Sequence, residues 1–140
     1  MTIKLMFDEN IAIKVVKALT AAATILAPDV EIAYLPEFTG RYSVPDNEWG
    51  DRVAKEGWIL ITADRGKTNR GIRLPRMCRD KGIRHVLAGT SMHCLRQIPK
   101  LASLLSVWDD LLAVSTAPVG SRFRWFRRNE SSKVEPFMPP

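Results

Sequence analysis

The sequence contains few of the residues on which zinc sites and disulfide-rich folds depend. It has two cysteines and two histidines in 140 residues. Cys78 and Cys94 show neither Cys-x-x-Cys spacing nor the pattern of a zinc ligand set, so both kinds of scaffold are excluded. A chain with so little cysteine fits a reducing compartment, and we expect the protein to be cytoplasmic.

Long apolar runs are also missing. No stretch approaches the roughly 18 apolar residues of a membrane-spanning helix, so no membrane contact is expected. The opening segment, Met1–Asp8, has too short an apolar run, and an acid too early, for a signal peptide. Gly66-Lys67-Thr68 matches the end of a phosphate-binding loop, but Ile61 occupies the position where that motif requires glycine, so such a loop is excluded.

Positive charge is in excess. The net charge is +6 and the pI about 9.7, which favours polyanionic partners, nucleic acid first and an acidic protein second. Lys and Arg outnumber the acids from Gly57 onward, whereas the segment Pro28–Asp51 is rich in acids. This separation is compatible with an acidic metal pocket beside a basic rim.

Apolar runs alternate with helical patterns along the chain. Strands are predicted, from their apolar or alternating composition, over residues 3–7, 30–35, 58–62, 84–88 and 121–128. Helices are predicted between them over residues 11–26, 47–56, 72–81 and 94–114. This order is typical of an α/β fold, a three-layer α/β/α sandwich with a mostly parallel sheet of about five strands. We expect one domain over residues 1–128 and a polar, proline-containing tail over residues 129–140.

Three acids lie at the boundaries of predicted strands and helices. Asp8 follows the first strand, Asp46 precedes the second helix, and Asp64 follows the third strand. The carboxyl ends of parallel strands open onto one crevice, where these carboxylates can meet around a divalent cation. Helix capping is the plainer explanation for Asp8 and Asp46. It does not suit Asp64, because burying a carboxylate after such an apolar strand is costly without a cation or several donors.

Three short blocks that contain these acids resemble those of the PIN-like domain family. The blocks are Leu5-Met6-Phe7-Asp8-Glu9-Asn10, Pro45-Asp46-Asn47-Glu48-Trp49 and Ile59-Leu60-Ile61-Thr62-Ala63-Asp64-Arg65. Their order is similar to that of the PIN-like toxins of bacterial toxin–antitoxin pairs, of the VapC type in its divergent branch. A weaker likeness continues through Trp108–Leu111 and Phe123–Arg128, so the resemblance covers most of the chain.

The resemblance implies a PIN-like fold and an endoribonuclease that uses Mg²⁺ or Mn²⁺ to cleave RNA. It implies Asp8, Asp46 and Asp64 as metal ligands, with Glu9 and Glu48 as neighbouring catalytic acids that orient the water. It also implies an RNA substrate, a cognate antitoxin protein as partner, and a homodimer. The chemistry is consistent, because a metal-bound water can attack a phosphodiester without a histidine or cysteine nucleophile.

The chain departs from the family pattern in two places. Many relatives carry a further acid soon after the third, where this chain has Arg65-Gly66-Lys67. They also often carry a fourth acid near the end of the fourth strand, where it has Gly89-Thr90-Ser91. Two alternatives therefore stay open. One is a non-catalytic PIN-like domain that binds RNA or protein, and the other is a different small α/β metal-dependent phosphohydrolase.

Basic segments supply the predicted RNA contacts, because arginine binds phosphate through two hydrogen bonds and stacks on bases. One of these segments follows the third predicted strand and contains Arg73, and the other is the last predicted strand, in which basic and aromatic residues alternate. The predicted contacts are Arg41, Arg65, Lys67, Arg70, Arg122 and Arg124. A structural explanation also exists for the last strand, whose aromatic side chains can pack into the core while its arginines are solvated at a sheet edge.

Overall fold

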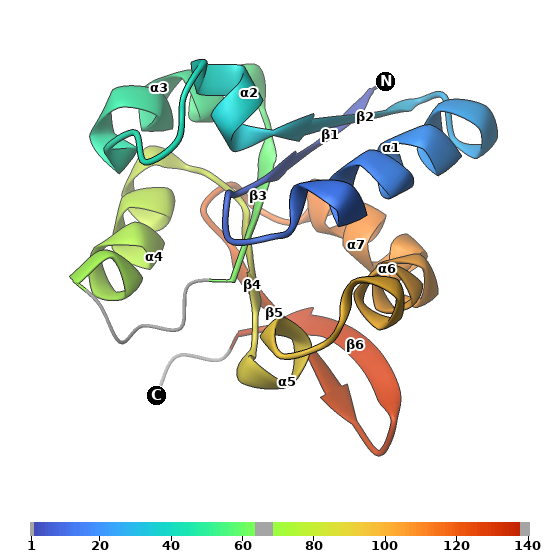
Figure 1. Ribbon diagram of the computed structural model, residues 1–140. Coiled ribbons are helices and arrows are strands. Elements are labelled where there is room, and N and C mark those ends of the chain that lie inside the picture. Colours follow the sequence, from blue (N-terminus) through green and yellow to red (C-terminus); the bar gives the residue numbers. More distant parts are fainter. Residues whose placement is uncertain (1, 64–68, 138–140) are drawn as a thin grey trace.

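Helices and strands alternate along almost the whole chain (Figure 1). The computed structural model describes residues 2–63 and 69–137, without the side chains of residues 69–72 and 93. The strands are β1 (Ile3–Phe7), β2 (Val30–Tyr34), β3 (Ile59–Thr62), β4 (His85–Ala88), β5 (Arg122–Arg128) and β6 (Ser131–Pro136). The helices are α1 (Ile13–Leu26), α2 (Leu35–Thr39), α3 (Asp46–Glu56), α4 (Asn69–Lys81), α5 (Thr90–His93), α6 (Gln97–Ser106) and α7 (Trp108–Ala113), which a short 3₁₀ turn, η1 (Val114–Thr116), follows. The predicted α/β class is confirmed.

The strands form one sheet in the order β2-β1-β3-β4-β5-β6. Neighbouring strands are parallel from β2 to β5, and β6 is antiparallel to β5. β1 and β3 lie inside the sheet with both faces covered, which explains their continuous apolar sequences. Every residue of β3 is buried, and so are Leu5, Met6 and Phe7 of β1. The mostly parallel sheet is therefore confirmed.

Two cores lie on opposite faces of the sheet. Side chains alternate along a strand, so Leu5 and Phe7 enter one core while Met6 enters the other. The first core packs against α1, α6 and α7, and the second against α3 and α4. In Figure 1 these two groups of helices stand to the right and to the left of the sheet. The predicted three-layer sandwich is confirmed.

The prediction of a polar tail over residues 129–140 is wrong. Ser131–Pro136 forms β6, which completes a hairpin with β5 and brings the sheet to six strands, one more than expected. Asn129 and Glu130 make the turn, and both have positive φ, 51° and 66°, as in the tight turns that suit a twisted hairpin. Asparagine tolerates this conformation well, so Asn129 is the sequence signal for the turn.

One buried tryptophan fastens this hairpin to the first core. Trp125 is 1% exposed, and its Nε1 donates to Ser103 Oγ at 2.8 Å. Ser103 Oγ in turn donates to Ser132 Oγ at 2.6 Å, which joins α6 to β6. Backbone pairing and this chain of hydrogen bonds hold β6 in place. A polar sequence is therefore compatible with a strand here.

Two helical regions differ from their predicted extents. The single helix predicted over residues 94–114 is divided, because Val107 leaves the helical conformation (φ −101°, ψ 13°) between α6 and α7. The segment that follows β2, for which no helix is predicted, contains the short helix α2. Pro36 lies in its first turn, where a backbone N–H would have no partner within the helix. No helix in the described part of the chain is long and apolar enough to cross a membrane.

Candidate active site

The strand order reverses at β1, because β2 lies on one side of it and β3 on the other. In open parallel sheets, ligands bind outside the carboxyl ends of the strands at such a reversal. Asp8 directly follows β1 at this point. Asp64, the predicted acid after β3, lies outside the described residues. The topology therefore selects the edge of the sheet next to Asp8 for a binding site.

Asp8 is fully buried, which is rare for a carboxylate. Its N–H donates to Ile61 O at 2.9 Å, so extended strand geometry continues through position 8. The alternation of side chains then assigns position 8 to the same side of the sheet as Met6, the side of α3 and α4. The capping explanation fails for Asp8, because the N-cap of α1 is Ala12 and no side-chain capping bond is made. A buried carboxylate requires compensating partners, so the charge of Asp8 is held in a fixed position.

A cavity of about 580 Å³ opens next to the turn between β1 and α1. It is bounded by that turn, by the loop that leads into α3, and by one side of α4. Its lining residues are Glu9, Ser43, Val44, Pro45, Asp46, Asn47, Arg73 and Met77. Two of the predicted acids, Glu9 and Asp46, therefore share one cavity although they come from different layers of the fold.

Glu9 joins the β1–α1 turn to the loop before α3. Its Oε2 accepts a hydrogen bond from Ser43 N at 3.3 Å, and its carbonyl accepts one from the Tyr34 hydroxyl at 3.4 Å. Ser43 has a φ of 57°, a left-handed conformation that costs a non-glycine residue roughly 1–2 kcal/mol. The Glu9 carboxylate helps to hold this backbone, so the shape of the cavity wall depends on it.

Asp46 is the first residue of α3 and lies on the cavity wall. Pro45, and not Asp46, is the N-cap of α3, so Asp46 occupies the first helical position. The helix dipole still favours a negative charge in the first turn. The Asp46 carboxylate is therefore stabilised by the α3 dipole at a position that also lines the cavity.

Glu48 and Arg41 lie against each other at the start of α3. Arg41 Nη2 is 3.6 Å from Glu48 Oε1, and both side chains are at least half-exposed. Neither residue lines the cavity that Glu9 and Asp46 share. Glu48, a predicted catalytic acid, therefore pairs with Arg41, a predicted RNA contact, outside the cavity lining.

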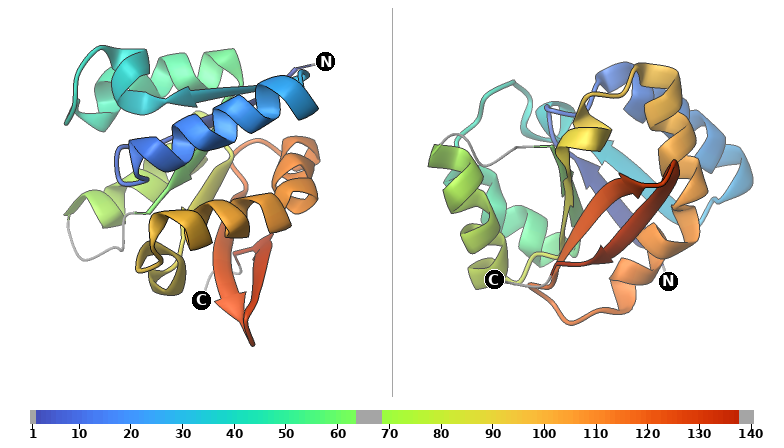
Figure 2. Two further views of the ribbon diagram at one scale, coloured as in Figure 1. Left: turned by 45° about the vertical axis from the view of Figure 1, so that its right-hand side comes forward. Right: turned by 90° about the horizontal axis from the view of Figure 1, so that it is seen from below.

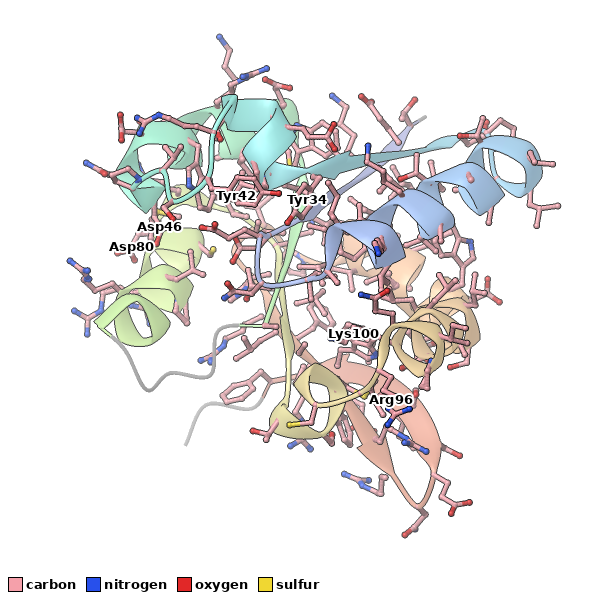
Figure 3. All side chains as sticks on the ribbon, in the orientation of Figure 1. Tyr34, Tyr42, Asp46, Asp80, Arg96 and Lys100 are labelled. Carbon is pink, nitrogen blue, oxygen red and sulfur yellow. The ribbon has the colours of Figure 1, made fainter. Side chains whose placement is uncertain are left out.

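Tyr34 and Tyr42 lie beside Glu9, with their ring centroids 6.3 Å apart in an edge-to-face arrangement (Figure 3). Tyr34 is buried, and this burial is the main reason why its pKa is raised above its ordinary value. The hydrogen bond with Tyr42 raises the pKa of Tyr34 further, as do the negative charges of Glu9 and Asp8. The Tyr34 hydroxyl therefore stays protonated and acts as a donor toward the Glu9 carbonyl.

The donor chemistry of these acids suits a hard divalent cation, because Mg²⁺ and Mn²⁺ prefer carboxylate and water oxygens. Asp8, Glu9 and Asp46 offer carboxylate oxygens at the same edge of the sheet. Among the described residues, no three histidine, cysteine, aspartate or glutamate side chains form a group that could hold a metal ion. A complete ligand set therefore requires Asp64, which lies outside those residues, or an oxygen from a bound phosphate.

One residue of the basic segment that follows β3 lines the cavity. Arg73, on α4, forms part of the wall. Its sequence signal is a repeat of arginine at every third position, 70, 73, 76 and 79, which keeps the side chains on neighbouring parts of a helix surface. Of the predicted contacts nearby, Arg65 and Lys67 lie outside the described residues, as does the side chain of Arg70.

The predicted contacts on β5 do not line the cavity. Arg122 is half-buried, with its guanidinium 3.9 Å from the Phe137 ring centroid, and burial lowers its pKa. Arg124 lies 4.3 Å from the Phe126 centroid and 3.9 Å from Glu135 Oε2. Both arginines therefore have partners within the hairpin, and their role in RNA binding stays a prediction.

Comparison with protein families gives one match. A family model described as a PIN like domain matches residues 3–84, which is more than half of the chain. The matched range contains the whole cavity lining and all five predicted acids. Comparisons with curated proteins and with solved structures gave no match. On the family match, this chain belongs to the PIN-like domain family.

Proposed function

We propose that this PIN-like domain is an endoribonuclease that uses Mg²⁺ or Mn²⁺ to cleave RNA phosphodiester bonds. The observation that carries the proposal is the cavity in which Glu9 and Asp46 lie together at the carboxyl edge of the sheet. The buried Asp8 precedes Glu9 at the end of β1, where the strand order reverses. Membership of the PIN-like family supports the same function, since nucleases are common in it.

The proposed metal ligands are Asp8, Asp46 and Asp64. A bound cation supplies a water of lowered pKa and stabilises charge on the departing oxygen. Glu9 would take the proton of the attacking water at Oε1, because its Oε2 already accepts the Ser43 N–H. Glu48 suits this role less well, because Arg41 lies next to its carboxylate outside the cavity.

Arg73 would bind a phosphate of the substrate. Its guanidinium can donate two parallel hydrogen bonds to phosphate oxygens. It lines the same cavity as Glu9 and Asp46, so its charge also offsets their repulsion of an incoming polyanion. The further proposed contacts are Arg41, Arg65, Lys67, Arg70, Arg122 and Arg124.

A cleavage assay tests the proposal. Purified protein is incubated with end-labelled RNA in Mn²⁺, in Mg²⁺ and in EDTA, beside the variant Asp8→Asn. Asp110→Asn is the matched control, because Asp110 is an exposed acid on α7, the face of the sheet that lacks the cavity. We expect metal-dependent cleavage by the wild type and the control, and none above background by Asp8→Asn. Equal cleavage by all three proteins would identify a contaminant and end the proposal.

A second candidate is a PIN-like domain that binds RNA or protein without cutting. Two observations favour it. Gly89-Thr90-Ser91 follows β4 without an acid, and Glu48 is engaged by Arg41. Retention of uncut RNA in a salt-dependent manner, in every metal tested, would select this function over the nuclease.

More specifically, the proposed ribonuclease is the toxin of a toxin–antitoxin pair, and its partner is a cognate antitoxin protein. It rests on the likeness of the three acid blocks to the toxin branch of the family. Expression of the protein alone should arrest growth, and co-expression of an adjacent small gene should restore it. Normal growth with active protein present would separate a housekeeping nuclease from a toxin.

A second copy of the chain is the partner that best fits the exposed face of α1 and α6. The two helices run side by side in the same direction (Figure 2). Their large exposed apolar residues are Ile25 (79% exposed), Leu26 (81%), Ile98 (81%) and Leu105 (49%). Leu26 and Leu105 line one hollow together with Trp108, and exposed apolar surface of this kind marks interfaces. Lys14 lies exposed near the start of α1, while Asp109 follows the far end of α6, so two copies in antiparallel orientation would bring opposite charges together.

Sedimentation measurements test this face. Ile25→Asp should give a monomer, because a charge would be buried in the apolar contact. Lys14→Asp should weaken the dimer, and adding Asp109→Lys should restore it. A wild type that is monomeric at all accessible concentrations would rule out the second copy as occupant.

A further inference from the structure

Tyr42 is the large aromatic side chain that lies most openly beside the acids. It is 58% exposed, although its neighbour Tyr34 is buried. The two rings meet edge to face at 72°, a geometry that orients the Tyr42 ring while leaving much of its surface in solvent. An aromatic ring in this position contributes little to the core. Its exposed surface is therefore available to a ligand.

The backbone on both sides of Tyr42 is held in place. Gly40 ends α2 with a φ of 89°, and its N–H donates to Pro36 O at 2.9 Å. Ser43, on the other side, is held by the Glu9 carboxylate. The segment between these two points is short, so the position of the Tyr42 ring is tied to that of the acid it adjoins. A ring that is already ordered loses little conformational entropy on binding.

The contact with Tyr34 links the ring to the same acid from a second direction. The Tyr34 hydroxyl donates to the Glu9 carbonyl at 3.4 Å. The Tyr42 ring therefore packs against a side chain that is itself fixed to the backbone of Glu9. Arg41, the residue before Tyr42, has its guanidinium 3.6 Å from Glu48 Oε1, and Ser43, the residue after it, lines the cavity.

We infer that Tyr42 is a stacking platform for one unpaired nucleobase of an RNA strand that enters the cavity. The inference rests on the proposed function and names its substrate class, RNA that is single-stranded at the site. Stacking on an aromatic ring contributes about 1–3 kcal/mol per base and tolerates all four bases. A base inside a duplex has both faces covered by its neighbours, so only an unstacked base can use the ring.

The platform and Arg73 would act on different parts of the strand. Arg73 lies on the α4 side of the cavity, whereas Tyr42 precedes Ser43 on the loop side. A strand that crosses the cavity can therefore present a phosphate to Arg73 and its base to Tyr42. Binding of the base would then position the neighbouring phosphodiester at Glu9 and Asp46.

Binding of short fluorescent oligoribonucleotides in EDTA tests this inference without cleavage. We expect Tyr42→Ala to weaken the affinity for single-stranded RNA about five- to a hundredfold, as loss of one stacked base predicts. Tyr42→Phe keeps the ring and should bind nearly as the wild type does. Val119→Ala is the matched control, because Val119 is 66% exposed and lies outside the cavity lining.

An abasic series gives the decisive comparison. Removing one base from the oligonucleotide should weaken wild-type binding at a single position, and that loss should vanish in Tyr42→Ala. A hairpin duplex should bind both proteins equally. If Tyr42→Ala binds single strands as tightly as the wild type while RNA is still cleaved, the platform is wrong and the nuclease stands. RNA that is bound through Tyr42 but never cut would support the platform and remove the nuclease.

Discussion

Arginine and aromatic side chains meet in two regions of this molecule, and they are used differently in each. On the β5–β6 hairpin, Arg124 lies 4.3 Å from the Phe126 centroid and 3.9 Å from Glu135 Oε2. At the cavity, Arg73 belongs to the wall, and Tyr42, which precedes the lining residue Ser43, is 58% exposed. In the hairpin the arginine side chains contact aromatic rings of the hairpin itself, whereas beside the cavity the Tyr42 ring is left exposed to solvent.

The comparison shows that residue type does not by itself identify an RNA-binding surface. An alternating basic and aromatic strand has the composition both of such a surface and of a solvated edge strand. The fold separates the two, because Trp125 of β5 is buried against α6 and Arg124 beside it lies over the partly buried ring of Phe126. We therefore expect changes in the hairpin to affect stability and changes at the cavity to affect RNA.

The largest expected effect is on stability and comes from the hairpin. Trp125→Ala should lower the free energy of unfolding by about 3–5 kcal/mol, because it leaves a cavity in the first core and frees the Ser103 hydroxyl from one partner. Urea denaturation measures the loss, and Trp125→Phe should lose less because it keeps most of the ring.

Trp125→Ala also tests the distinction between the hairpin and the cavity. If Trp125→Ala keeps the stability of the wild type but loses RNA binding, the hairpin is a nucleic-acid surface and the distinction between the two regions fails.

The next effect is on metal dependence and comes from the cavity. Asp46→Asn should raise the Mg²⁺ or Mn²⁺ concentration needed for half-maximal cleavage about 10- to 100-fold, because a neutral amide replaces a charged ligand. The free energy of unfolding should fall by about 1 kcal/mol or less, because the lost charge is one in the first turn of α3.

Asp51→Asn is the matched control for that experiment. Asp51 lies on the same helix, is exposed, and forms an ion pair with Lys81 away from the cavity lining. An equal shift in metal dependence for both variants would show that the general charge of α3, and not a ligand at the cavity, sets the response.

Much of the architecture could be predicted from local sequence. Apolar runs as continuous as Leu5–Phe7 and Ile59–Thr62 need burial on both faces, and this requirement fixes a parallel sheet with helices on either side. The placement of Asp8 after β1 and Asp46 at the start of α3 followed from the same element boundaries. Such features depend on residues close together in the chain.

The errors concern features that distant contacts decide. β6 has no apolar pattern of its own, and it is ordered by pairing with β5 and by the bond between Ser103 and Ser132. The break at Val107 interrupts a stretch whose helical spacing is unbroken in sequence. Arg73 was expected only as one of several basic residues after β3, and the packing of α3 on α4 is what brings it to the acids.

A smaller effect separates the arginines of the two regions by their salt dependence. Each phosphate contact to a single strand adds about 0.7 to the slope of log affinity against log salt. Arg73→Ala should reduce that slope by about this amount, whereas Arg124→Ala should leave it unchanged. Fluorescence anisotropy over a range of NaCl concentrations gives both slopes, and the reverse result would assign the phosphate contact to the hairpin.

The smallest expected effect comes from the ion pair on the hairpin. Glu135→Gln removes the charge that lies 3.9 Å from Arg124, in a pair whose side chains are 45% and 39% exposed. Solvent screening limits the change in unfolding free energy to about 0.5 kcal/mol or less. The RNA affinity is the more informative quantity, because loss of this acid would strengthen binding if Arg124 reached a phosphate. An unchanged affinity at low salt would mean that the hairpin arginines belong to the fold, and a severalfold gain would mean that they belong to the substrate path.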